Sequence, residues 1–254
     1  MFIKGETDLT RARGVKAQRR QHYEVENTIN FNQQVPTKTR LRQIEIIPKS
    51  RGQENLVLAL ADNKTPVVIA VGPAGTGKTY LAMQSAIKAL KSGEVEKLVL
   101  TRPAIGVDDE KHGFLPGDIN QKMEPWTRPL MDVLHEYYNP KDVARMLEDQ
   151  TIEISPLAFM RGRTFKAAYI IADEMQNATP GQMKMLLTRI GEGSKIVVTG
   201  DVEQADRSNL NNGLLDIAAR LERYPTAGLE VCRLGSKDTQ RHPLIVSVLG
   251  LYKD

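Results

Sequence analysis

One short stretch of the chain has the residue types and the spacing of a phosphate-binding loop. The sequence Gly72-Pro73-Ala74-Gly75-Thr76-Gly77-Lys78-Thr79 places two glycines around four free positions and ends in Lys-Thr. An apolar, β-branched run over 66–71 predicts a buried strand before it, and residues 78–91 predict a helix with one apolar face. Such a loop points successive backbone N–H groups and the positive end of a helix at one anion. We therefore expect it to bind nucleotide phosphates.

Four side chains could carry the chemistry of phosphate transfer at this loop. Lys78 is the predicted positive charge facing the β- and γ-phosphates, and the Thr79 hydroxyl is a predicted Mg²⁺ ligand. A second apolar run over 168–172 ends in paired carboxylates. Asp173 is expected to hold Mg²⁺ through water, and Glu174 to accept a proton from the attacking water. Together these residues predict a site that hydrolyses Mg-ATP.

Three further residues are candidates for contact with the nucleotide. Gln53 begins a helix predicted to extend to about residue 61, and one amide offers both the donor and the acceptor that an adenine edge needs. The alternative is an ordinary glutamine at a helix N-terminus. Tyr80 directly follows the loop and is counted among the nucleotide-binding residues. Gln204 follows a strand predicted over 195–199, where it could sense the γ-phosphate, or could simply belong to a polar turn.

Two other segments carry candidates for nucleic-acid contact. Thr101 and Arg102 lie near the end of a strand predicted over 97–103, and ligands of open α/β sheets bind beyond the carboxyl ends of strands. Arg161 and Arg163 flank Gly162 and form a loop suited to phosphate contacts. The alternative for these two arginines is pairing with surface carboxylates.

Composition limits the class of protein. The chain has 254 residues, 41% of them hydrophobic, which is enough for a packed α/β core. Cys232 is the only cysteine, so an internal disulfide or a multi-cysteine zinc site is excluded, and a cytoplasmic location is expected. No run is long and apolar enough to cross a bilayer.

The basic charge is concentrated at one end of the chain. Residues 1–51 carry 11 Lys/Arg against 5 Asp/Glu, a net charge of +6, whereas the remainder carries 24 against 26, a net charge of −2. We expect a basic, partly ordered extension over 1–50 and an ATPase domain over 51–254. The extension either binds a polyphosphate backbone or is a solvated arm without a specific partner.

The motifs together resemble the PhoH family of phosphate-starvation-inducible ATPases. The matching segments are 72–79, 100–104, 157–164, 173–177, 198–201 with Gln204, and 241–243. Met175 stands where the family usually has alanine, which should alter packing and not chemistry. The resemblance implies a P-loop NTPase with a mostly parallel sheet and helices on both faces, similar to one core domain of a superfamily-one helicase. It also implies ATP and Mg²⁺ as cofactors, and action on RNA or single-stranded nucleic acid.

Helicases of that kind pair two such domains, whereas this chain has one phosphate-binding loop. A motor would therefore need a neighbouring subunit, so we expect a homo-oligomer, most simply a ring such as a hexamer. Arg241 is the predicted arginine finger, acting in its own site or across the ring, with a surface arginine at a turn as the alternative.

Two other functions remain open from the sequence. A small-molecule kinase could use the same loop, and thymidine kinases have a similar Asp-Glu-Ala-Gln strand end. Those enzymes generally contain a four-cysteine zinc lobe that one cysteine cannot build. The second alternative is a nucleotide-dependent switch or scaffold that hydrolyses ATP slowly.

Overall fold

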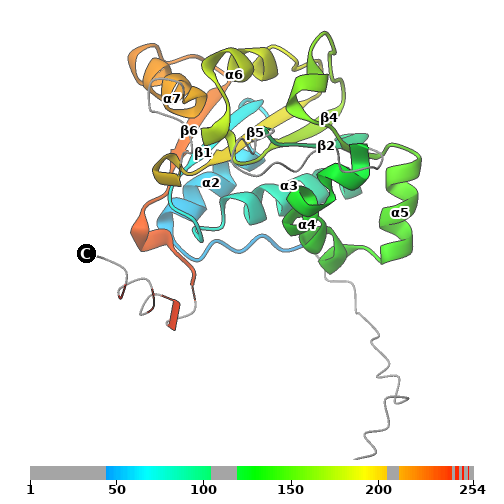
Figure 1. The fold of residues 1–254 in the computed structure, drawn as a ribbon. Coiled ribbons are helices and arrows are strands. Elements are labelled where there is room, and N and C mark those ends of the chain that lie inside the picture. Colours follow the sequence, from blue (N-terminus) through cyan, green and yellow to red (C-terminus); the bar gives the residue numbers. More distant parts are fainter. Residues whose placement is uncertain are drawn as a thin grey trace, which may run out of the picture. The chain divides into compact units, whose positions relative to one another are not determined.

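Six parallel strands form the centre of the computed structural model, in the order β3-β2-β4-β5-β1-β6 (Figure 1). The strands are β1 (Val67–Val71), β2 (Lys97–Thr101), β3 (Ile152–Ile154), β4 (Ala168–Ala172), β5 (Lys195–Gly200) and β6 (Leu229–Arg233). The structure describes residues 44–103, 119–204 and 212–241, together with positions 244, 245, 248 and 251; over 119–127 it describes the backbone only.

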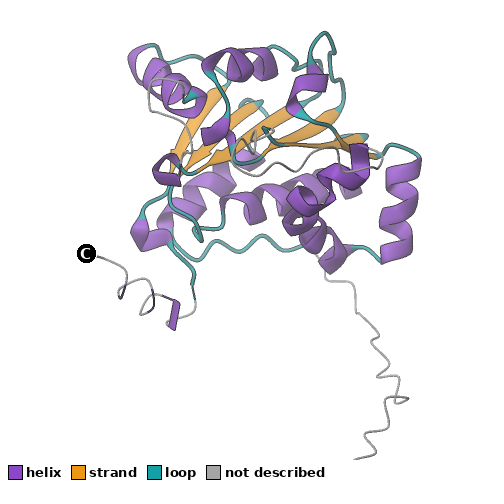
Figure 2. Ribbon diagram, in the orientation of Figure 1, coloured by secondary structure: helices purple, strands orange, loops and turns teal. Residues whose placement is uncertain are grey.

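Helices cover both faces of this sheet, as Figure 2 shows. The helices are α2 (Arg51–Ala61), α3 (Lys78–Ser92), α4 (Ile119–Tyr137), α5 (Pro140–Glu148), α6 (Pro180–Leu187) and α7 (Gly213–Arg223). Helices α2, α3 and α4 pack on one face, and α6 and α7 pack on the other. Short 3₁₀ helices follow several strands: η1 (Leu157–Met160), η2 (Met175–Asn177), η3 (Val202–Gln204) and η5 (Ser236–Asp238).

Strand β1 shows why its sequence reads as a continuous apolar run. Val68 and Ala70 pack into the core beneath α2 and α3, whereas Val67, Ile69 and Val71 pack into the core on the α6–α7 side. Neighbouring residues of a strand point to opposite faces, so a strand covered on both sides has no position for a polar side chain. The predicted fold class, a parallel α/β sheet between two helical layers, is confirmed.

Local signals placed the element boundaries within a residue or two. Helix α6 begins at Pro180 behind a capping box in which the Thr179 hydroxyl accepts from the Gln182 backbone N–H. Helix α2 starts at Arg51, before the predicted start at Gln53, because Ser50 is its N-cap. Helix α7 was not predicted, and β6 lies at the edge of the sheet that the described residues form, paired with β1.

The described part of the predicted extension 1–50 is limited to residues 44–50. There, Ile44 and Ile46 are partly buried against the core formed by α2 and α3. Residues 1–43, including the basic run, lie outside the described residues, as do His242 and Pro243. Among the helices that the structure describes, none combines the length and the apolar character needed to cross a membrane.

Candidate nucleotide-binding site

The loop between β1 and α3 has the backbone conformation that its glycines permit. Gly75 and Gly77 have φ values of 81° and 82°, in the left-handed region that side chains with a Cβ seldom adopt. At Gly72 the constraint is space, because a Cβ there would lie 2.4 Å from the carbonyl oxygen of Leu234. The Thr76 hydroxyl donates to the Pro73 carbonyl at 2.8 Å, which braces the loop from within. The glycines therefore shape a loop that opens at the start of α3.

Lys78 lies buried across this loop, with 7% of its surface exposed. Its ammonium group donates to the carbonyl oxygens of Gly72 and Pro73 at 2.7 and 2.8 Å. Burial lowers the pKa of Lys78, while the nearby carboxylates of Asp201, Glu174 and Asp173 act in the opposite direction. The loop thus holds a desolvated positive charge next to the space where phosphates would bind.

Asp173 collects two hydroxyl groups at the carboxyl end of β4. Its Oδ1 accepts from the Thr79 hydroxyl at 2.7 Å and from the Thr199 hydroxyl at 2.5 Å. Mg²⁺ is commonly held by one or two protein oxygens plus phosphates and water. The adjacent oxygens of Thr79 and Asp173 fit that pattern. Phosphate and water would take the remaining positions around the ion. No group of three or more His, Cys, Asp or Glu suited to a metal occurs among the described residues.

Glu174 begins a chain of contacts that ends in the phosphate-binding loop. Its backbone is left-handed, with a φ of 54°, and its Oε2 accepts from the Gln176 amide at 2.5 Å. The side-chain oxygen Oε1 of Gln176 accepts from the backbone N–H of Asp201 at 3.1 Å. Asp201 in turn accepts from the backbone N–H of Ala74 at 2.9 Å. The carboxyl ends of β4 and β5 are therefore linked to the loop after β1.

These groups share one cavity of about 250 Å³ at the carboxyl edge of the sheet. Its lining comprises Ala74, Gly75, Gly77, Lys78, Thr79, Tyr80, Asp173, Glu174, Gly200, Asp201 and Gln204. Most of the predicted phosphate and metal residues are thus brought together. Asp201 and Thr199 were not predicted as site residues. Their positions could have revealed them: Thr199 lies at the end of β5 and Asp201 directly follows that strand, and β5 lies between β4 and β1 in the sheet.

Gln53 and Tyr80, predicted to contact the nucleotide, are engaged within the protein. The Gln53 amide donates to the Thr76 carbonyl at 3.0 Å, and its oxygen accepts from the Lys49 N–H at 2.8 Å. This buried glutamine therefore braces the loop, and an adenine contact stays a prediction. The Tyr80 hydroxyl donates to Glu136 at 3.1 Å, while the residue also lines the cavity.

Arg241 lies against the phosphate-binding loop of its own chain. A Cβ on Gly75 would lie 2.5 Å from Nε of Arg241, and the backbone N–H of Gln240 donates to the Gly75 carbonyl at 2.8 Å. Asp238 fastens this segment, accepting from the Gly52 N–H at 3.1 Å and the Gly235 N–H at 2.7 Å. The structure thus places the predicted finger over the loop, a contact that the sequence could not show.

The four candidates for nucleic-acid contact have different surroundings. Arg102 lies 3.8 Å from Oε1 of Glu174, next to the nucleotide cavity. Thr101 is buried, and its hydroxyl has no partner among the described residues. Arg161 is exposed. Arg163 donates to both carboxylate oxygens of Glu153, which is the alternative of pairing with a carboxylate. A phosphate contact by Arg163 stays a prediction.

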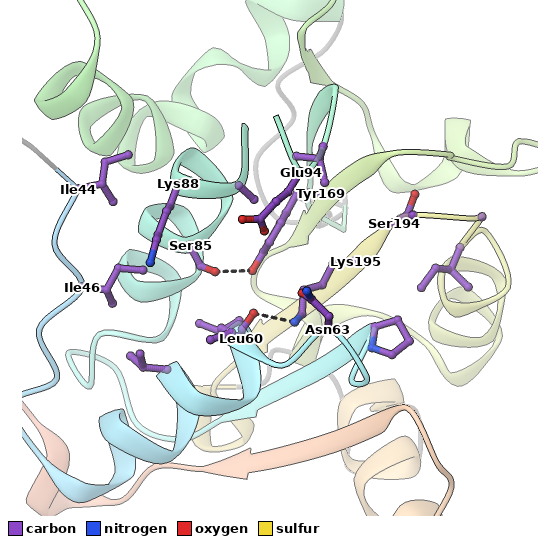
Figure 3. A pocket seen from close by; sticks show the side chains of 18 of the residues that line it. Ile44, Ile46, Leu60, Asn63, Ser85, Lys88, Glu94, Tyr169, Ser194 and Lys195 are labelled. Carbon is purple, nitrogen blue, oxygen red and sulfur yellow. Dashed lines mark hydrogen bonds between the residues drawn. The ribbon is translucent and has the colours of Figure 1, made fainter. Parts of the chain in front are cut away.

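A larger cavity of about 890 Å³ lies at the opposite, amino edge of the sheet (Figure 3). Two of its polar groups are bound within the protein: the Lys195 amine donates to the Leu60 carbonyl at 2.6 Å, and the Tyr169 hydroxyl donates to Ser85 at 3.0 Å. Burial lowers the pKa of Lys195. Because ligands of parallel sheets bind at the carboxyl ends of the strands, we assign the nucleotide to the smaller cavity.

Comparison with known proteins identifies the family of this chain. The family model described as PhoH-like protein matches residues 45–253. A PhoH-like protein of Bacillus subtilis is 46% identical over 205 residues, which are 80% of this chain and 63% of that protein. The Escherichia coli K12 protein PhoH is 37% identical over 206 residues, covering 80% and 57%. This chain therefore spans about three-fifths of the length of these relatives.

Solved structures with a similar fold are more distant. The Sulfolobus solfataricus SWI2/SNF2 ATPase core matches with a TM-score of 0.43 and 14% identity, covering 77% of this chain and 46% of that one. The Candida albicans Pif1 helicase matches with a TM-score of 0.39 and 15% identity, covering 81% and 44%. The family is shown by the sequence matches, over nearly all of the described residues: this chain belongs to the PhoH family, with a P-loop NTPase fold.

Proposed function

We propose that this protein is an ATPase that hydrolyses Mg-ATP and couples hydrolysis to RNA or single-stranded nucleic-acid binding or unwinding. One observation carries the proposal: a buried lysine, a hydroxyl–carboxylate pair and a second carboxylate meet at one cavity beside a phosphate-binding loop. Hydrolysis needs a positive charge on the phosphates, a magnesium site and an acceptor for the proton of water. Each of those needs has a candidate in the cavity.

Each side chain then has a distinct role. The loop N–H groups and Lys78 bind the β- and γ-phosphates, and Thr79 with Asp173 would hold Mg²⁺, which would neutralise phosphate charge. Glu174 takes a proton from the attacking water. Gln204 lines the cavity and senses the γ-phosphate. Arg241, lying on the loop, stabilises negative charge that develops on the transferring phosphoryl group.

Nucleic acid is assigned to the carboxyl edge of β2 and the neighbouring η1 loop. Arg102 directly follows β2 and lies 3.8 Å from Glu174 of the nucleotide cavity, and Arg161, directly after η1, is exposed. The basic segment 1–51, with a net charge of +6, supports a polyanionic partner. We further propose a homo-oligomer, most simply a hexameric ring, because two-domain motors require a second domain that one loop does not supply. The single cysteine supports a cytoplasmic location.

A steady-state assay tests this function and its alternatives. The protein with Mg-ATP is measured alone, with oligo-U RNA, with oligo-dT DNA and with nucleosides. The expected result is release of inorganic phosphate that a polynucleotide accelerates. Transfer of phosphate to a nucleoside would replace the proposal with a kinase. Nucleotide binding without turnover under every condition would instead indicate a switch or scaffold.

A further inference from the structure

The carboxylate of Glu174 is held from two sides. Its Oε2 accepts from the Gln176 amide at 2.5 Å, while its Oε1 lies 3.8 Å from a guanidinium nitrogen of Arg102. One oxygen therefore accepts a hydrogen bond, and the other faces a positive charge beyond hydrogen-bond distance. A carboxylate that is to take a proton from water needs an oxygen within hydrogen-bond reach of that water. Gln176 and Arg102 thus set the direction of the Glu174 carboxylate, and with it the access of that carboxylate to the attacking water.

The two partners of Glu174 come from different parts of the molecule. Gln176 lies in η2, directly after Glu174, and also binds the backbone of Asp201, so it belongs to the nucleotide side of the site. Arg102 follows β2, which is not part of the nucleotide cavity. It is thus the contact through which an event outside the cavity could reach Glu174.

Strands β2 and β4 fix the distance between these groups. Thr101 pairs with Ala172 in the parallel register, and the Asp173 N–H donates to the Thr101 carbonyl at 3.0 Å. The backbones before Arg102 and Glu174 are therefore tied together. A change in their contact has to come from the side chains, and the Arg102 side chain is 23% exposed, so an external group can reach it.

The chemistry of arginine selects the group that would compete for Arg102. A guanidinium binds a phosphate through two parallel hydrogen bonds, which is stronger than a single ion contact at 3.8 Å. A phosphodiester of a single-stranded polynucleotide, at the carboxyl edge of β2, offers the oxygens that a guanidinium binds.

We propose that Arg102 is a positioning residue that holds Glu174 in a resting arrangement, and that a polynucleotide phosphate removes Arg102 and so frees Glu174 to act. This inference rests on the proposed function, since it explains how nucleic acid would control hydrolysis at the same site. It assigns to Arg102 two alternative partners, a carboxylate of the protein and a phosphate of the polynucleotide.

The test compares the parent protein with Arg102→Ala and Arg102→Lys, in the absence and presence of oligo-U RNA or oligo-dT DNA. Without polynucleotide, Arg102→Ala should raise kcat about two- to fivefold, the factor that a partly exposed ion pair contributes to an equilibrium. The KM for ATP should not change. Added polynucleotide should then give little further acceleration. Arg102→Lys keeps the charge and should return the low resting rate.

Two further variants distinguish the regulation of Glu174 by Arg102 from a general structural effect. Arg220→Ala removes an exposed arginine–carboxylate pair on α7, remote from the cavity, and should leave both rates unchanged. The double variant Arg102→Ala with Glu174→Gln should lose the added turnover, because that turnover depends on the freed carboxylate. Retention of the elevated rate in the double variant would overturn the proposal.

The outcomes also separate this inference from the proposed function. If the parent hydrolyses ATP and Arg102→Ala has the same resting kcat, the proposed role of Arg102 is overturned. The proposed ATPase function is unaffected by that result. The variant could instead lose only polynucleotide affinity and keep the resting rate and the maximal acceleration. Arg102 would then be a nucleic-acid contact, and its proposed control of Glu174 would be overturned. Absence of hydrolysis in every protein and condition overturns the proposed function itself.

Discussion

Different residues of the cavity are expected to serve ATP binding and ATP hydrolysis. Lys78 is buried within the phosphate-binding loop, and its ammonium group is held by loop carbonyls. Glu174 lies at the edge of the cavity, with its side chain 35% exposed. Removing the Lys78 side chain should weaken phosphate binding directly, whereas removing the Glu174 carboxylate should affect only the proton transfer. The two roles can therefore be separated by measuring binding and turnover independently.

We predict that Lys78→Ala weakens ATP binding sharply, because the charge facing the phosphates is lost. Glu174→Gln should bind ATP as the parent does and hydrolyse it at least about 100-fold more slowly, since the shape is kept and the proton acceptor is lost. Titration with a fluorescent ATP analogue and phosphate release measure the two effects. Glu174→Gln turning over at the parental rate would refute the role of Glu174.

The sequence could predict the residues whose role follows from a local pattern. The loop over 72–79 and the strand end Asp173-Glu174 carry their own spacing and neighbours. The contacts of Thr199 with Asp173 and of Asp201 with Ala74 join residues far apart in the chain, so they depend on the strand order. The buried bracing role of Gln53 likewise depends on where α2 packs.

At the scale of elements, short-range rules succeeded where packing agreed with them. Helix α4 continues through Pro125 and Pro129, although an internal proline removes a backbone hydrogen bond and strains the preceding turn. Helix α7 packs Leu214 onto the core beside β5 and η2, a tertiary contact that no local signal announced. Tertiary burial therefore outweighs the internal prolines of α4, whereas α7 also has a local signal, its Asn212 N-cap.

The short edge strand β3 is fastened by charge. Arg163, from the loop after η1, donates to both oxygens of Glu153, and Lys97 at the start of β2 lies 3.2 Å from the same carboxylate. The hydrogen bonds from Arg163, followed by that from Lys97, lower the pKa of Glu153. A carboxyl group whose pKa is lower in the folded state stabilises the fold above its unfolded pKa, and loses that effect as the pH falls through the folded value.

We predict that Glu153→Gln lowers the free energy of unfolding at pH 7 by about 1 kcal/mol, a value discounted because Arg163 is partly exposed. The difference from the parent should shrink as the pH falls below about 4.3, the ordinary pKa of glutamate, since both proteins then carry a neutral group. Urea unfolding at several pH values measures this. Glu148→Gln on the exposed face of α5 is the control, and a pH-independent difference would contradict the prediction.

At the scale of the whole chain, the excess positive charge and the nucleotide cavity lie in different segments of the sequence. Residues 1–51 carry a net +6, whereas the part with the nucleotide cavity is near neutral. We predict that deleting residues 1–20 weakens polynucleotide binding and flattens its dependence on salt, by up to about 0.7 in logarithmic slope for each lost phosphate contact. The resting ATPase rate should change little. An unchanged slope in a fluorescence-anisotropy titration would leave the segment without this function.

The position of Arg241 bears on how many subunits build one site. Helicase-like motors bring an arginine to the phosphates from a second domain or subunit, which in a ring would be the neighbour. Here Arg241 packs on Gly75 of its own chain, and Asp238 fastens the same segment to the start of α2. These contacts need no second copy. They favour an arginine that acts within the chain that holds it.

We therefore predict that Arg241→Ala binds ATP normally and hydrolyses it roughly 10³-fold more slowly, because an arginine finger contributes about that factor or more. Mixing Arg241→Ala with Lys78→Ala subunits should not restore turnover, since neither chain then holds both an intact loop and its own arginine. Restored activity, with subunit exchange confirmed by differently labelled chains, would show instead that the arginine acts across an interface. Near-parental turnover by Arg241→Ala alone would reject the finger in either form, and Arg220→Ala is the matched control for loss of an exposed arginine.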